Sequence, residues 1–159
     1  KEYNFLLNND KSNVNWYILR YADVLLMYAE ALNEWHHGPN NAALAALNMV
    51  RRRGYGLPYN EANTTVDLKS TSYEGFQEYI RNERAYELAF EGNRRQDLIR
   101  WGIYYETIVN TYIKLIGWYP EANYVAYQYT QKNKHELLPI PARDMSLMEN
   151  FKQNQGWGD

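Results

Sequence analysis

The stretch RYADVLLMYAEALNE, residues 20–34, decides the fold of this chain. Apolar residues recur through it at steps of three and four, a spacing that lines them along one face of an α-helix. The repeat begins two residues before this stretch and is carried by Ile18, Ala22, Leu25, Ala29 and Leu32. Further apolar residues widen this face, so the helix has to be covered on more than one side. We therefore predict a central helix over residues 16–35.

A second helix is predicted directly after the first. Gly38 and Pro39 interrupt the apolar repeat, and Asn41 is a suitable N-cap for a helix over residues 41–53. Gly54 can adopt the left-handed conformation that ends many helices. A short turn between two amphipathic helices favours antiparallel packing. The order of small and large apolar residues in this second helix is typical of a tetratricopeptide unit.

A loop and a second helical hairpin follow. Residues 55–72 are rich in Gly, Pro, Asn, Thr and Ser, which indicates a surface loop. Helical periodicity returns over residues 73–91, and Gly92 allows a turn into another helix that begins near Arg94. Residues 104–116 can continue this helical pattern.

The expected fold class is therefore all-α. We predict helical hairpins over residues 16–53 and 73–116, of the tetratricopeptide-like kind. Residues 117–159 contain many aromatic residues without helical periodicity, and we expect an irregular C-terminal segment with one short helix over residues 142–149.

Composition excludes several classes of function. The 17 Lys and Arg residues nearly balance the 19 Asp and Glu residues, and the formal charge of −2 provides no excess positive potential for nucleic acid. There is no Cys, so thiolate chemistry and Cys-ligated zinc are excluded. The longest apolar stretch is too short to span a bilayer. The sequence begins at Lys1 without the charged and apolar regions of an export signal. We expect that targeting signals were removed or that the sequence is a fragment.

The charged side chains predict a structural ion network rather than a catalytic centre. Glu83, Glu87 and Glu91 recur every four residues, and like charges on one helical face repel one another unless cations meet them. Arginine can hold such carboxylates bidentately. The candidate partners are Arg94, Arg100 and the three arginines of residues 51–53. We assign no residue a catalytic role.

No metal or cofactor site is predicted. His36 and His37 lie in a turn beside Gly38, and His135 is about a hundred residues away, so no pair has the spacing of metal ligands on one helical face. A phosphate-binding glycine loop and a nucleophile elbow are absent from the sequence as well.

The aromatic residues after the second hairpin have two interpretations. They can pack the preceding helix against the body of the protein. Alternatively, Trp118, Tyr119 and Tyr124 can stack on sugar rings while Asn123 hydrogen-bonds sugar hydroxyls. These four residues are the candidate ligand-binding residues.

Four phrases, taken together, resemble the C-terminal region of the SusD/RagB family. The phrases are RYADVLLMYAEALNE at 20–34, ALNMVRRRG at 46–54, RNERAYELAFEGNRRQDLIRWG at 81–102, and LLPIPARDM from 137 with QNQGW ending at 157. Gln155 departs from the family, which usually has Pro there, and the family's proteins are roughly three times longer than this chain.

The resemblance implies a helical, lipid-anchored protein on the outer face of the bacterial outer membrane. It implies a binding subunit that captures oligosaccharides, or peptides in the RagB branch, for a TonB-dependent, SusC-like transporter. The lipid-bearing Cys and many ligand-contacting insertions would lie upstream of this sequence. Membrane association would then depend only on that anchor.

Two other classes of function remain open. The helical hairpins could form a scaffold that binds a protein partner, in which case an apolar patch on a hairpin face is expected. A glycoside hydrolase would need two carboxylates about 5–9.5 Å apart across a cleft, and the sequence gives no reason to expect them.

Overall fold

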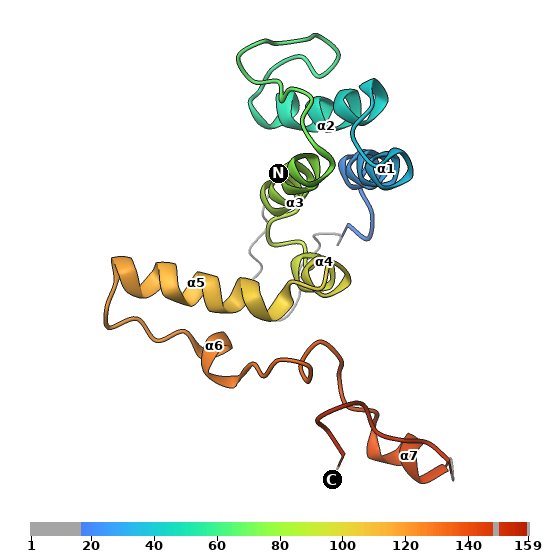
Figure 1. The fold of residues 1–159 in the computed structure, drawn as a ribbon, viewed down its shortest axis with the longest axis vertical. Coiled ribbons are helices and arrows are strands. Elements are labelled where there is room, and N and C mark those ends of the chain that lie inside the picture. The colour runs from blue at the N-terminus through green and yellow to red at the C-terminus, as the bar shows by residue number, and fades with distance from the viewer. Residues whose placement is uncertain (1–16, 148–149, 159) are drawn as a thin grey trace, which may run out of the picture. The chain divides into compact units, whose positions relative to one another are not determined.

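A computed structural model of the protein describes residues 17–147 and 150–158. Its helices, in chain order, are α1 (Tyr21–His36), α2 (Asn41–Gly54), α3 (Tyr73–Glu87), α4 (Arg94–Arg100), α5 (Tyr104–Trp118), α6 (Val125–Tyr129) and α7 (Ala142–Leu147), as Figure 1 shows. These described residues contain no strand. The prediction of an all-α fold with an irregular, aromatic-rich C-terminal segment is confirmed. The chain divides into two compact units, Lys1–Arg94 and Arg95–Asp159.

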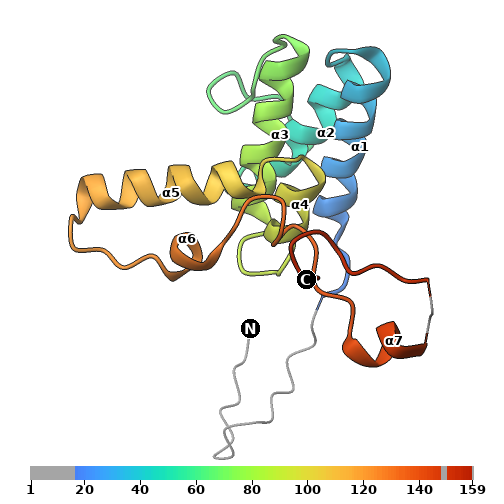
Figure 2. The same cartoon turned by 60° about the horizontal axis from the view of Figure 1, so that its bottom comes forward.

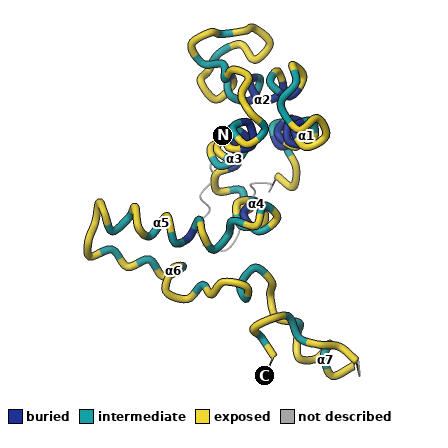
Figure 3. Tube along the Cα trace, in the orientation of Figure 1, coloured by how far each residue is buried: buried dark blue, intermediate teal, exposed yellow. Residues whose placement is uncertain are grey.

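In the first unit, α1, α2 and α3 pack side by side around one hydrophobic core (Figures 1 and 2). Leu26, Leu47 and Phe76 are fully buried, and each comes from a different helix. Ala29 and Ala43 are also fully buried, and such small side chains let neighbouring helices approach closely. The buried positions in Figure 3 follow the faces that these helices turn toward one another.

Helix α1 begins at Tyr21, five residues later than predicted: residues 17–20 are not helical, and Ile18, predicted on the apolar face, is 92% exposed. The end of α1 and the bounds of α2 lie within one residue of the prediction. Asn40, not Asn41, is the N-cap of α2, because its extended backbone lets its side chain accept a hydrogen bond from the Ala43 N–H at 2.8 Å. Gly54 belongs to the helix, and the left-handed residue beyond it is Gly56, with φ of 72°. Helix α1 is capped at its C-terminal end by His37, which has a left-handed backbone conformation. The His37 N–H donates a hydrogen bond to the Asn33 carbonyl.

Helix α3 ends at Glu87, four residues earlier than the periodicity predicts. The chain turns at Phe90 and Gly92, which have φ of 65° and 85°. The Glu87 carbonyl accepts a hydrogen bond from the Arg20 side chain at 2.9 Å. Glu91 consequently lies in the turn after α3, and not on the helical face that carries Glu83 and Glu87.

The loop over residues 55–72 is fastened to α2 by side chains of that helix. Asn48 exchanges two hydrogen bonds with the backbone of Leu68, at 2.8 and 3.0 Å. Arg52 holds the Asp67 carboxylate with two nitrogens, at 2.5 and 2.6 Å. Arg51 donates from Nε to the Val66 carbonyl at 2.8 Å. These contacts give the loop a defined position on the first unit.

The second unit has little core of its own. Ile108 is the only buried residue of α5. Tyr112 of α5 stacks on Tyr127 of α6, with ring centroids 4.0 Å apart and 8° between the planes. Farther along, the Gln153 side chain exchanges hydrogen bonds of 2.7 and 2.8 Å with the backbone of Ile140. Among the described residues, no helix combines the length and the hydropathy that a membrane crossing requires.

The core of the first unit yields a matched pair of stability predictions. Phe76→Ala should lower the free energy of unfolding by about 3–5 kcal/mol, because it removes a fully buried aromatic ring. Phe90→Ala makes the same chemical change at a fully exposed ring and should alter stability by no more than about 0.5 kcal/mol. Urea unfolding followed by circular dichroism measures both. Equal losses would contradict this description of the core.

Candidate functional site

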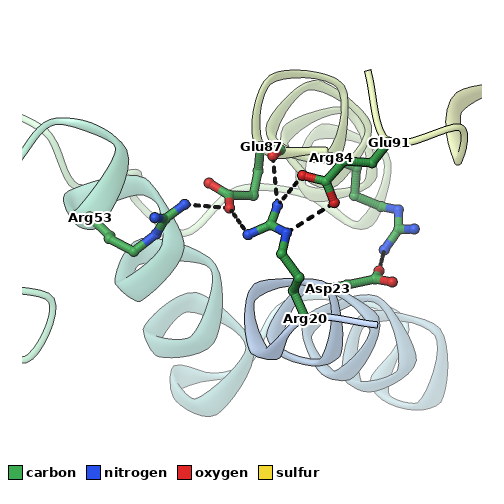
Figure 4. A network of polar contacts seen from close by, with 6 residues as sticks. All are labelled: Arg20, Asp23, Arg53, Arg84, Glu87 and Glu91. Atoms are coloured by element: carbon green, nitrogen blue, oxygen red, sulfur yellow. Dashed lines mark hydrogen bonds and ion pairs between the residues drawn. The ribbon is translucent and has the colours of Figure 1, made fainter. Parts of the chain in front are cut away.

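Arg20 joins the first helix to the end of the third. It precedes α1 in an extended conformation, and its guanidinium crosses to α3 (Figure 4). Nε and Nη2 bind the two carboxylate oxygens of Glu91 at 2.9 and 2.7 Å, while Nη1 binds Oε1 of Glu87 at 2.7 Å. Hydrogen bonding to Glu91 raises the pKa of Arg20 above its already high value, so this group is permanently charged.

Glu87 is shared between two helices. Its Oε1 also accepts a hydrogen bond from Arg53 of α2, and the Glu87 side chain is only 6% exposed. Burial opposes ionisation of this carboxyl, but the hydrogen bonds from Arg53 and Arg20 outweigh it and hold the pKa below the usual 4.5. Glu87 therefore remains ionised as the centre of contacts among all three helices of the core.

Two further ion pairs extend the network. Arg84 of α3 donates to Asp23 of α1 at 2.7 Å, and both side chains are largely buried (Figure 4). Arg51 of α2 donates to Oε2 of Glu83 at 3.1 Å. Burial raises the pKa of Glu83 above 4.5, and the hydrogen bond from Arg51 offsets this only in part.

The predicted partners Arg94 and Arg100 have other described contacts. Arg94 donates to the Arg81 carbonyl at 3.2 Å, and Arg100 donates to Asp97 at 3.0 Å. A place for these two arginines in the network of Glu83, Glu87 and Glu91 stays a prediction. Sequence reasoning did not identify Arg20 or Asp23 as members of the network, because both occur in an ordinary helix-forming context and pair with residues more than sixty positions away.

The network supplies fixed ion pairs between helices. Its carboxylates are held by guanidinium groups, which suits a structural role. The described part of the chain contains no group of three His, Asp or Glu side chains that could hold a metal ion.

The four candidate ligand-binding residues lie at the connection between α5 and α6. Trp118 is the last residue of α5 and not a loop residue as predicted, and it is 75% exposed. Tyr119 follows as the C-cap and is 65% exposed, while Asn123 is exposed and Tyr124 is half-buried before α6. The Tyr119 carbonyl accepts from the Ala122 N–H at 2.9 Å, which closes a turn between the two helices.

A pocket that sequence reasoning missed lies beside α2 and α3, and we refer to it as the α2–α3 pocket. Its volume is about 640 Å³. Its lining residues are Arg51, Gly54, Tyr55, Leu68, Tyr79, Asn82, Glu83, Tyr86 and Glu87. A signal was present in the sequence, since Tyr79, Asn82, Glu83 and Tyr86 have the i, i+3, i+4, i+7 spacing of one helical face.

The sequence is similar to those of known proteins over almost its whole length. The family model described as "SusD family" matches residues 5–157. SusD-like protein P25 of Formosa agariphila is 37% identical over 147 residues, which cover 90% of this chain and 25% of that protein. SusD-like protein P2 of the same organism is 30% identical over 151 residues, covering 92% of this chain and 26% of the relative.

Solved structures agree with these matches. The crystal structure of a SusD homolog from Bacteroides thetaiotaomicron superposes with a TM-score of 0.85 at 55% identity and covers 96% of this chain. A SusD superfamily protein from Parabacteroides distasonis gives a TM-score of 0.62 at 26% identity over 94% of this chain. The chain spans 29% of each of these two proteins, so it corresponds to less than a third of its relatives.

The Arg20 contacts can be tested by comparing two arginines that bind the same oxygen. Arg20→Met should lower the free energy of unfolding by about 3 kcal/mol, because it leaves Glu91 and the partly buried carbonyl of Glu87 without their partner. Arg53→Met should cost less than about 1 kcal/mol, because Arg53 is 59% exposed and its pairing is screened by solvent. Chemical denaturation measures both variants. A cost for Arg53→Met as large as that for Arg20→Met would contradict the burial argument.

The two network carboxyls should have opposite effects on acid stability. Because the pKa of Glu87 is lowered, its stabilising contribution is present above pH 4.5 and is lost as the pH falls through its folded value. The pKa of Glu83 is raised, so its contribution is present below 4.5 and is lost as the pH rises through its folded value.

Glu87→Gln should therefore lose less stability than the parent protein on acidification, and Glu83→Gln should lose more. The measurement is the urea midpoint from neutral pH down to about pH 3. Changes of the same sign in both variants would show that the directions assigned to the two carboxyls are wrong.

Proposed function

This chain belongs to the SusD family, and from that membership we propose that it is part of a glycan-binding protein of the bacterial outer membrane. In this proposal the protein binds its ligand without transforming it. It captures oligosaccharides at the cell surface and passes them to a TonB-dependent, SusC-like transporter. A lipid anchor outside these 159 residues tethers it to the membrane. A peptide ligand, as in the RagB branch, is the alternative within the same mechanism.

The observation that carries the proposal for these residues is the exposure of Trp118 and Tyr119. The two rings stand in solvent side by side in the sequence, at the connection between α5 and α6. An aromatic face provides apolar area for the C–H face of a sugar ring. Asn123 and Tyr124 add polar groups in the same short connection. Together they match the composition of a sugar-binding surface.

A second candidate function, a scaffold for a protein partner, is favoured by the outer face of α1. Tyr21, Val24, Tyr28, Ala31 and Trp35 recur at steps of three and four, and all five are exposed. This spacing is the seam against which another helix packs. The occupant proposed for this face is therefore a helix of the partner.

The two functions predict different regions of contact. Hydrogen exchange of the purified protein should show protection at residues 118–124 on addition of glycan if the first function holds. Protection of α1 on addition of a protein partner, together with residues 118–124 that glycan leaves unchanged, would instead support the scaffold.

Truncation of Trp118 tests the glycan proposal. Trp118→Ala in the intact protein should weaken binding of a neutral oligosaccharide at least about tenfold, since truncating an aromatic anchor costs about 2 kcal/mol or more. Isothermal titration calorimetry against a panel of plant, algal and bacterial oligosaccharides measures the effect. Circular dichroism checks that the fold is retained.

The matched control is Trp35→Ala, which removes the same side chain from another exposed position. Its glycan affinity should equal that of the parent protein. If Trp118→Ala bound as tightly as the parent, the exposed aromatic residues after α5 would have no role in ligand capture.

A further inference from the structure

We propose that the α2–α3 pocket is a second glycan subsite, which binds one neutral sugar ring and uses none of the residues around Trp118. The assignment to sugars rests on the proposed function, whereas the shape and polarity of the pocket do not. Its volume of about 640 Å³ lies within the range of about 300–1,000 Å³ that small-molecule sites occupy.

Three tyrosines provide the apolar surface of the pocket. Tyr79 is half-buried and packs edge-on against the core residue Phe76, with ring centroids 6.4 Å apart. Tyr55 and Tyr86 are exposed, and the Arg51 guanidinium lies over the Tyr55 ring at 5.3 Å. Tyrosine offers a large rigid face at low cost in conformational entropy, which suits the face of a sugar ring.

Glu83 and Asn82 supply hydrogen-bonding capacity that the protein does not use. Glu83 is 7% exposed, and among the described residues only its Oε2 has a hydrogen-bond partner, so Oε1 remains an acceptor. The Asn82 side chain is exposed and has no described partner either. A sugar hydroxyl both donates and accepts. One hydroxyl can therefore donate to Glu83 and accept from the Asn82 amide.

The charges of the pocket select a neutral ligand. Arg51 is already committed to Glu83 at 3.1 Å and to the Val66 carbonyl at 2.8 Å, and it occupies the position over Tyr55 that a cationic ligand would take. Glu87 is neutralised by Arg20 and Arg53. An anionic ligand thus finds no available cation, and a cationic ligand would have to displace Arg51.

The walls of the pocket are held in place by the surrounding contacts. Asn48 and Arg51 bind the backbone of the loop that contributes Leu68, and Tyr79 is packed on the core. Little of the binding free energy is then spent on ordering side chains when a ligand enters.

Fluorine NMR of the intact protein labelled with 3-fluorotyrosine tests this site directly. The Tyr86 resonance is assigned by its loss in Tyr86→Phe. The probes are glucose, galactose, mannose, xylose, cellobiose and mannobiose, with galacturonate and choline as the charged comparisons. We expect neutral sugars to shift the Tyr86 resonance saturably, and the charged probes to leave it unchanged.

Three variants complete the test. Asn82→Ala should weaken the apparent affinity about fivefold, the loss expected for one neutral hydrogen bond, without unfolding the protein, since Asn82 has no described partner. Tyr28→Ala truncates an exposed tyrosine of α1 outside the pocket and is the control for a surface truncation, which should have no effect. Trp118→Ala should leave the Tyr86 shift intact.

The outcomes separate this site from the proposed function. If no neutral sugar shifts the Tyr86 resonance, the α2–α3 pocket is not a glycan subsite. Loss of calorimetric binding in Trp118→Ala would then still support the proposed glycan-binding function. A shift caused only by galacturonate or choline overturns the ligand class, and an Asn82→Ala variant with unchanged affinity overturns the geometry. A saturable shift with neutral sugars, together with a Trp118→Ala variant whose calorimetric affinity for glycan is unchanged, would support the pocket and contradict the site at the end of α5.

Discussion

The guanidinium of Arg20 is the constraint on which the rest of the first unit depends. One planar group satisfies two carboxylates and the last carbonyl of α3, from a position just before α1. These bonds can form together only if α3 stops at Glu87 and the chain turns Glu91 back toward α1. The same interaction therefore sets the length of a helix, the shape of its exit turn and the packing of α1 on α3. A lysine has one compact charge and could not meet these three requirements at once.

Much of the fold follows from the sequence, because the apolar periodicity of α1 and α2 is strong and predicts both helices. The buried face of α1 is shifted from the predicted one, since Asp23 and Glu30 lie on it and Ile18 does not. The end of α3 could not be read in this way. Periodicity continues to Glu91, and only the distant Arg20 makes an earlier stop favourable. The same limit applies to the ion network. Its carboxylates stand out by their regular spacing, whereas the choice of arginine depends on tertiary packing.

The candidate binding residues divide along similar lines. Trp118 and Tyr119 could be predicted from the sequence because aromatic residues are concentrated at the end of α5 and in the segment that follows it. Both are exposed in the structure. The α2–α3 pocket combines one face of α3 with Tyr55 and Leu68 of the loop, which α2 fastens through Asn48 and Arg51. The helical face has a readable spacing in the sequence. The position of the loop beside this face cannot be read from the sequence, because it depends on hydrogen bonds between side chains of α2 and the loop backbone.

The ion network and the pocket are linked by more than proximity along α3. Arg51 and Glu83 belong to both, and Glu87 lines the pocket while it binds Arg20 and Arg53. Because these charges compensate one another within the protein, they offer no unpaired charge to a ligand. Burial makes the ionised form of Glu83 costly, and a hydroxyl donating to its unused oxygen would relieve part of that cost. The contacts that hold the three helices together thereby give the pocket its preference for neutral, hydroxyl-bearing ligands.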